Sequence, residues 1–156
     1  MAKEHSFQIT FLNNKTESLG INYLIENCTG FFKISLEMKK QILDLLKLSH
    51  TFHRAFDLIF IPRFIGQIIT TDVIEAHIDE IILVELKCTR KYLPNNPKGF
   101  FFGATENEFK FGELLGDRFR FCFVSLHEDS PSHAMLTIAE LASIVRHKRI
   151  QYQINL

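Results

Sequence analysis

The chain of 156 residues fits a single domain and is long enough to bury a full hydrophobic core. Its 18 lysines and arginines balance its 18 aspartates and glutamates, which counts against a protein whose main task is to hold nucleic acid electrostatically. No apolar run approaches the roughly 20 residues that span a bilayer, and the start lacks the apolar stretch of a secretory signal. The cysteines Cys28, Cys88 and Cys122 are odd in number and widely spaced, which suits a reducing compartment. We therefore expect a cytoplasmic protein without membrane contact.

The first third of the chain predicts one strand and two helices. Residues 6–12 (SFQITFL) alternate between polar and apolar side chains and predict a strand. A short helix is expected from Thr16 onward. Ser35 is the expected N-cap of a helix over residues 36–48, whose apolar residues recur at helical spacing.

Three consecutive strands are predicted next. Residues 55–62 (AFDLIFIP) form an apolar run that stops at a proline, and residues 67–76 (QIITTDVIEA) are rich in β-branched side chains. Residues 79–89 (DEIILVELKCT) follow after a short polar break. The connections between these segments are short enough for antiparallel neighbours, and residues 92–100 form a loop dense in proline, asparagine and glycine.

The last third predicts two helices and two strands. Each helix opens with the T-x-x-E spacing of a capping box, at residues 105–108 and 137–140. Residues 118–126 (RFRFCFVSL) alternate strictly, which puts a row of phenylalanines on one strand face and assigns them to the core. Residues 150–156 (IQYQINL) predict a final strand.

From residue 36 the predicted order is helix, strand, strand, strand, helix, strand. This order indicates an α/β fold with a mixed central sheet flanked by helices. We expect one domain over residues 1–156, with a core at about residues 36–126. The segments before and after it, 1–35 and 127–156, are expected to pack on this core as extensions.

The run IDEIILVELKCT carries Glu85 and Lys87 in an otherwise apolar strand. Since strand side chains alternate between faces, these two point the same way, with Thr89 next along the line. A carboxylate and an ammonium are costly to bury unless they are paired or hold a metal ion. The pair is therefore either a strand end that reaches solvent or a functional site.

A second carboxylate could join this pair from a neighbouring strand. Asp72 lies in the predicted strand just before Glu85, and a hairpin would bring the two together. Asp57 is the rival, because it too is followed by an aliphatic pair. Topology favours Asp72, because Asp57 lies one predicted strand earlier. Two carboxylates suit Mg²⁺, which usually takes one or two from a protein.

The D…E-x-K pattern within this order of elements resembles the PD-(D/E)xK nuclease superfamily, whose restriction-endonuclease-like core is αβββαβ. The sequence ELKCT, followed by FFFGATENEFKFGELLGDRFRFCFV, is similar to the NO VEIN C-terminal domain family over roughly residues 36–126. In that family an E-V-K-x-T strand precedes a T-x-N-E helix and a G-D-x-Y-x-x-Y strand. Here Leu86 replaces the usual valine, and Phe119 stands where tyrosine is expected.

The resemblance implies a magnesium-dependent endonuclease that hydrolyses DNA in restriction, defence or repair, with manganese as a substitute ion. Asp72 and Glu85 would be the metal ligands, and Lys87 would orient or deprotonate the attacking water. The alternative is a catalytically inactive module of the same fold that binds nucleic acid or a partner protein, which the zero net charge favours. Many enzymes of this fold act as dimers, so a homodimer or a larger defence complex is a further expectation.

Several other side chains are candidates for supporting roles. Possible additions to the catalytic group are Glu37, Asp57 and Thr89. Residues that could contact a phosphate are Lys110, Arg118 and Arg120. Each has an ordinary alternative role, because an acidic residue in a first helical turn stabilises that helix and surface cations commonly face solvent or form salt bridges.

Overall fold

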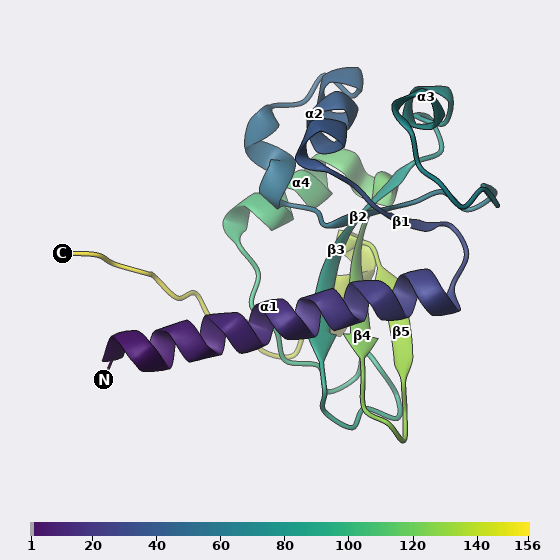
Figure 1. Ribbon diagram of the computed structural model, residues 1–156. Helices are drawn as coiled ribbons and strands as arrows, with labels where there is room; N and C mark the ends of the chain where they lie inside the picture. The colour runs from purple at the N-terminus through teal and green to yellow at the C-terminus, as the bar shows by residue number, and fades with distance from the viewer. Residues whose placement is uncertain (1) are drawn as a thin grey trace.

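The computed structural model describes the backbone of residues 2–156 and the side chains from residue 15 onward. Across these residues the chain forms one five-stranded sheet in the order β1-β2-β3-β4-β5 (Figure 1). The pair β3–β4 is parallel, and the other three neighbouring pairs are antiparallel. The expected α/β architecture with a mixed central sheet is therefore confirmed. The strands are β1 (Phe31–Lys33), β2 (Leu58–Phe60), β3 (Ile82–Thr89), β4 (Phe119–Ser125) and β5 (Ser132–Leu136).

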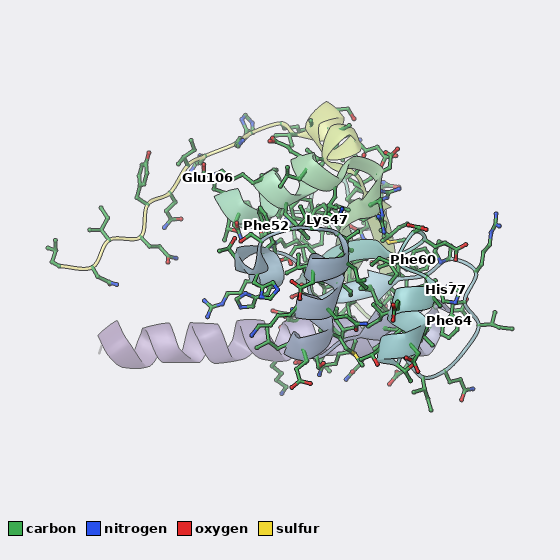
Figure 2. The ribbon with its side chains drawn as sticks, turned by 90° about the horizontal axis from the view of Figure 1, so that it is seen from above. Lys47, Phe52, Phe60, Phe64, His77 and Glu106 are labelled. Carbon is green, nitrogen blue, oxygen red and sulfur yellow. The ribbon has the colours of Figure 1, made fainter. Side chains whose placement is uncertain are left out.

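Helices cover both faces of this sheet. Figure 2 shows α1 on one side of the molecule and α4 on the opposite side. The α-helices are α1 (Ala2–Asn27), α2 (Leu36–Leu45), α3 (Thr71–Ala76), α4 (Glu106–Leu115) and α5 (Ile138–Ile144), with 3₁₀ turns η1 (His50–Arg54) and η2 (Gly116–Arg118). Among the described residues no helix combines the length and the apolar character needed to cross a bilayer.

Alternation along the strands divides the buried side chains into two hydrophobic clusters. In β4 the phenylalanine row faces the cluster that includes residues of α2, α3, α4 and α5, whereas Cys122 and Val124 face the cluster under α1. The row is fully buried, so its assignment to the core is confirmed. In β3 Leu83 belongs to the first cluster and Val84 to the second. Glu85 and Lys87 therefore share the face that α4 covers.

Local capping signals placed three helix starts correctly. The Ser35 hydroxyl accepts a hydrogen bond of 3.2 Å from the Met38 amide at the start of α2. Both T-x-x-E segments form complete capping boxes, at Thr105 for α4 and at Thr137 for α5. These contacts satisfy amide groups that the first turn of a helix leaves without partners.

Two predicted strands belong to helices instead. Residues 6–12 lie within α1, and residues 71–76 form α3. The alternation in 6–12 is short, and no glycine or proline precedes Gly20 to end the helix. In the second case Thr70 accepts a hydrogen bond from the Val73 amide, and this cap outweighs the β-branched composition. Asp72, expected in a strand, therefore lies in the first turn of α3.

The predicted strand at 150–156 is also absent. Residues 145–156 form neither helix nor strand, and their side chains are exposed. Figure 1 shows this segment (yellow) running away from the body. A strand needs a neighbour for its backbone hydrogen bonds, and the sheet of this chain does not extend to these residues.

Gly112 marks the closest packing of α4 against its neighbours, so we expect Gly112→Val to destabilise the fold. A Cβ at this position would lie 2.4 Å from Ile138 Cγ1 and 2.9 Å from Phe119 Cδ1. Overpacking of this kind costs about 1–3 kcal/mol. The matched control is Gly103→Val, because a Cβ there meets nothing within 4 Å. Urea unfolding of both variants should show the loss at Gly112 alone; equal losses would contradict the packing described.

Candidate active site

Lys87 joins two buried carboxylates from different elements. Its Nζ donates a hydrogen bond of 3.0 Å to Glu85 Oε1 in β3 and bonds of 3.2 Å to both oxygens of Glu108 in α4. The side chains are 13%, 7% and 8% exposed, in the order Lys87, Glu85, Glu108. Lys87 Nζ also lies 5.8 Å from the centre of the Phe121 ring. The charged pair of β3 is therefore an internal site, not a strand edge in solvent.

Glu108 is the member of this group that the sequence did not reveal. Its T-x-x-E spacing predicted a capping box, and Glu108 Oε2 does accept a bond of 2.8 Å from the Thr105 amide. The same carboxylate also holds Lys87, so it serves the helix start and the site together. Nothing in the spacing distinguishes a capping glutamate that faces solvent from one that faces a buried lysine.

Asp57, not Asp72, lies beside this pair. The β2–β3 register pairs Leu58 with Val84, and continuing it by one residue brings Asp57 to Glu85. Two hydrogen bonds bracket Glu85 and fix this placement: the Asp57 amide donates to Val84 O at 2.8 Å, and the Leu86 amide donates to Asp57 Oδ2 at 2.9 Å.

Asp72 is exposed on α3, so the expectation that it would meet Glu85 across a hairpin was wrong. The rival residue of the sequence analysis takes that place. The reason is that residues 71–76 are helical, which removes the predicted strand between β2 and β3 and makes these two strands direct neighbours.

The group contains three carboxylates, those of Asp57, Glu85 and Glu108, and one ammonium, that of Lys87. Burial and these charges shift the pKa values of Glu85 and Lys87. Burial, followed by repulsion from Asp57, raises the pKa of Glu85 well above its usual value of 4.5, against the attraction of Lys87. Burial disfavours the charge of Lys87, but Glu85 and Glu108 outweigh it and raise the pKa of the lysine. Among the described residues, Glu85 Oε2 is buried without a hydrogen-bond partner.

Two more charged side chains approach from the helices. Lys39 of α2 donates hydrogen bonds to Phe56 O at 2.7 Å and to His53 O at 3.2 Å, directly before Asp57. Glu17 of α1 has a pKa raised by burial and then by Asp57, and lowered by Lys87 and Lys39. Sequence reasoning missed both, because neither belongs to a recognisable motif.

The other acidic and hydroxyl candidates are peripheral. Glu37 is exposed in the first turn of α2, the position in which it favours the helix start. Thr89 ends β3 on the side of Lys87, and its hydroxyl accepts a hydrogen bond from the Lys91 amide at 3.3 Å. Thr89 therefore shapes the turn after the strand.

The basic candidates are engaged in local contacts. Lys110 forms an exposed ion pair with Glu106 at 3.4 Å. Arg118 donates to the carbonyl oxygens of Ile78 and Ile81, and Arg120 donates to those of Asp117 and Phe119. The arginines hold backbone at one end of the sheet, a role different from both the phosphate contact and the salt bridge considered from sequence.

The carboxylates of Asp57 and Glu85 are suited to a divalent cation. Across the described residues, no three or more histidine, cysteine, aspartate or glutamate side chains gather in a ready-made metal cluster. Mg²⁺ does not need one, since it keeps several waters and takes only one or two carboxylates. The partnerless Oε2 of Glu85 and the repulsion from Asp57 are the features that such a cation would relieve.

No known family model, curated protein or solved structure matches this chain. What the site can do therefore follows from its own geometry and charges.

Removing the Lys87 ammonium should cost far more stability than removing an exposed one. Lys87→Met would leave the buried Glu108 carboxylate without its cation, and breaking a buried pair in this way costs about 3–5 kcal/mol. Lys110→Met is the matched control, because its pair with Glu106 is exposed and contributes less than about 1 kcal/mol. Urea unfolding near neutral pH measures both; similar losses would show that Lys87 is not the cation that holds this buried group.

The raised pKa of Glu85 predicts a pH-dependent gain from Glu85→Gln. Because folding raises this pKa above 4.5, the fold favours the neutral acid, and ionisation costs stability as pH rises past that value. Glutamine stays neutral, so its stability advantage over the parent should grow from about pH 5 to about pH 8. Denaturant unfolding across this range tests it, with Glu106→Gln as the exposed control. An advantage that shrinks with pH would mean that Lys87 outweighs burial.

Proposed function

We propose that this protein is a metal-dependent nuclease that hydrolyses phosphodiester bonds of DNA, with Asp57, Glu85 and Lys87 as its catalytic group. The observation that carries the proposal is the meeting of Asp57 with Glu85 across β2 and β3, on the sheet face that also holds Lys87. Asp57 takes the role first expected for Asp72. This restores the D…E-x-K group with a different aspartate.

The arrangement of elements supports the same proposal. Counting α1 as the first helix, the order α1, β1, β2, β3, α4, β4 is the αβββαβ order expected of a restriction-endonuclease-like core. In it, β1, β2 and β3 are antiparallel neighbours, and α4 makes the crossover to the parallel strand β4. The helices α2 and α3 are then insertions between strands.

Asp57 and Glu85 would hold Mg²⁺, with Mn²⁺ as a substitute. When bound, the ion supplies neutralisation of the charge that develops on the phosphate and lowers the pKa of a bound water. Asp57 is suited to this because the Leu86 amide fixes one of its oxygens and leaves the other for a ligand. Glu85 is suited because its Oε2 has no other partner in the described part of the chain.

Lys87 would act on the phosphate or on the attacking water through its positive charge, and by hydrogen bonding if it gives up its contact with Glu85 Oε1 when Glu85 holds the ion. An ammonium has three donors, and Glu108 fixes its position from α4 with two contacts of equal length. Its raised pKa keeps it cationic at neutral pH, which favours orienting the water and stabilising negative charge over deprotonating the water. Glu108 is a positioning residue in this scheme.

A second candidate function is a non-catalytic module of the same fold. One observation favours it: Lys87 is already saturated by Glu85 and Glu108 in a buried ion-pair group, an arrangement that can be purely structural. The two functions differ in whether the site takes up a divalent ion and whether nucleic acid is cleaved.

The decisive test is cleavage of DNA and RNA by the whole chain with Mg²⁺ or Mn²⁺. Asp57→Asn and Glu85→Gln should each lower the rate by more than about 100-fold, the upper end of what loss of a metal site's outer partners costs. Asp72→Asn is the matched control and should leave the rate unchanged, because Asp72 is exposed on α3. If Asp72→Asn abolished cleavage and Asp57→Asn did not, Asp72 and not Asp57 would be the catalytic aspartate.

Titration calorimetry with Mn²⁺ separates the nuclease from the module. Since the raised pKa of Glu85 keeps the acid protonated, binding should release a proton and should tighten as pH rises. Glu85→Gln should abolish both effects. A wild-type chain that neither binds Mn²⁺ in the presence of DNA nor cleaves any substrate would support the module.

A further inference from the structure

The segment 146–156 is basic, whereas the rest of the chain is acidic on balance. It carries Arg146, Lys148 and Arg149, together with His147, and contains no acidic residue. Removing these three cations from the total of 18 leaves 15 basic residues against 18 acidic ones in the rest of the chain. The zero net charge is therefore the sum of an acidic body, residues 1–145, and a basic arm, residues 146–156.

The basic arm is extended and open to solvent. All of its residues are exposed, and two of its large side chains, Ile150 and Tyr152, are 76% and 80% exposed. Figure 1 shows it leaving the body on the side toward which the N-terminal half of α1 also projects. An acidic body would attract such a segment if charge alone decided its path, so its exposure leaves Arg146 and Arg149 available to another partner, whereas Lys148 also contacts an aromatic ring.

The arm begins close to the candidate active site. Lys148 Nζ lies 5.1 Å from the centre of the Phe109 ring in α4, and that ring lies 5.7 Å from Phe121. Phe121 is the ring that Lys87 Nζ approaches at 5.8 Å. One pair of aromatic rings therefore separates Lys148 of the arm from the catalytic lysine.

We propose that residues 146–152 bind the phosphate backbone of a nucleic acid and place it at the active site. This inference rests on the nuclease proposed above and deepens it by locating a substrate-binding surface. Clustered cations beside a reactive centre attract a polyanion, and binding releases the counterions condensed on it. The exposed ring of Tyr152 follows the cations and offers a surface on which a base can stack.

The test measures binding without cleavage, in the Glu85→Gln background with metal removed by EDTA. Fluorescence anisotropy with labelled single-stranded DNA, duplex DNA and RNA of about 20 nucleotides gives the affinity from about 50 to 200 mM salt. The triple change Arg146→Gln, Lys148→Gln and Arg149→Gln should weaken binding at least about tenfold at low salt. It should also make the slope of log K against log salt shallower by about 2 to 3.

A matched triple change, Lys33→Gln, Lys40→Gln and Arg63→Gln, removes three other exposed cations from β1, α2 and the loop after β2. It should leave affinity and slope at the parent values. Tyr152→Ala should weaken single-strand binding about tenfold and duplex binding less.

The proposal that the arm binds nucleic acid would be overturned if the two triple variants lost affinity equally. It would also be overturned if the Glu85→Gln protein bound none of the three probes. Light scattering that shows self-association lost in the arm triple, with nucleic-acid binding unchanged, would also overturn it and make the arm an interface between copies of this chain. Binding that depends on the arm, without cleavage under any condition, would instead refute the nuclease alone.

Discussion

The buried charged side chains of this protein depend on the ammonium group of Lys87. It lies where β3 meets α4, and it is shared between a carboxylate from each element. Without it, the buried Glu108 carboxylate would have no cation, an arrangement that proteins avoid because desolvating an unpaired charge is so costly. The ion-pair group therefore also fixes how α4 lies on the sheet, and the capping box at Thr105 sets where that helix starts.

Excess negative charge around that ammonium gives the site its chemical character. Asp57 reaches the group through the antiparallel pairing of β2 and β3, and burial together with repulsion from Asp57 raises the pKa of Glu85, so the fold favours the neutral acid at this position. The same feature that costs stability is the one that would bind a divalent ion. Stability given up at a functional site is a common arrangement in enzymes.

The acidic and basic residues of this chain are concentrated in different parts of the fold. Residues 1–145 carry the acidic excess, and Lys148 in the extended basic segment lies beside Phe109 of α4. The acidic excess of residues 1–145 would repel a polyanion that comes within about a Debye length of exposed carboxylates. In the proposed nuclease, the cations of this segment would offset that repulsion for an approaching phosphate backbone.

The sequence by itself determined the features that depend on neighbouring residues. Capping at Ser35, Thr105 and Thr137, the phenylalanine row of β4, and the shared face of Glu85 and Lys87 all follow from local hydrogen bonds or from strand alternation. Tertiary structure decided the rest. Which aspartate meets Glu85 depended on which strands are neighbours, and the helix at 71–76 settled it for Asp57. Glu108 became part of the site because α4 packs over β3, and residues 150–156 remained without a sheet because a strand exists only beside another strand. Local patterns carry propensity, whereas strand pairing and burial are decided by segments far apart in the chain.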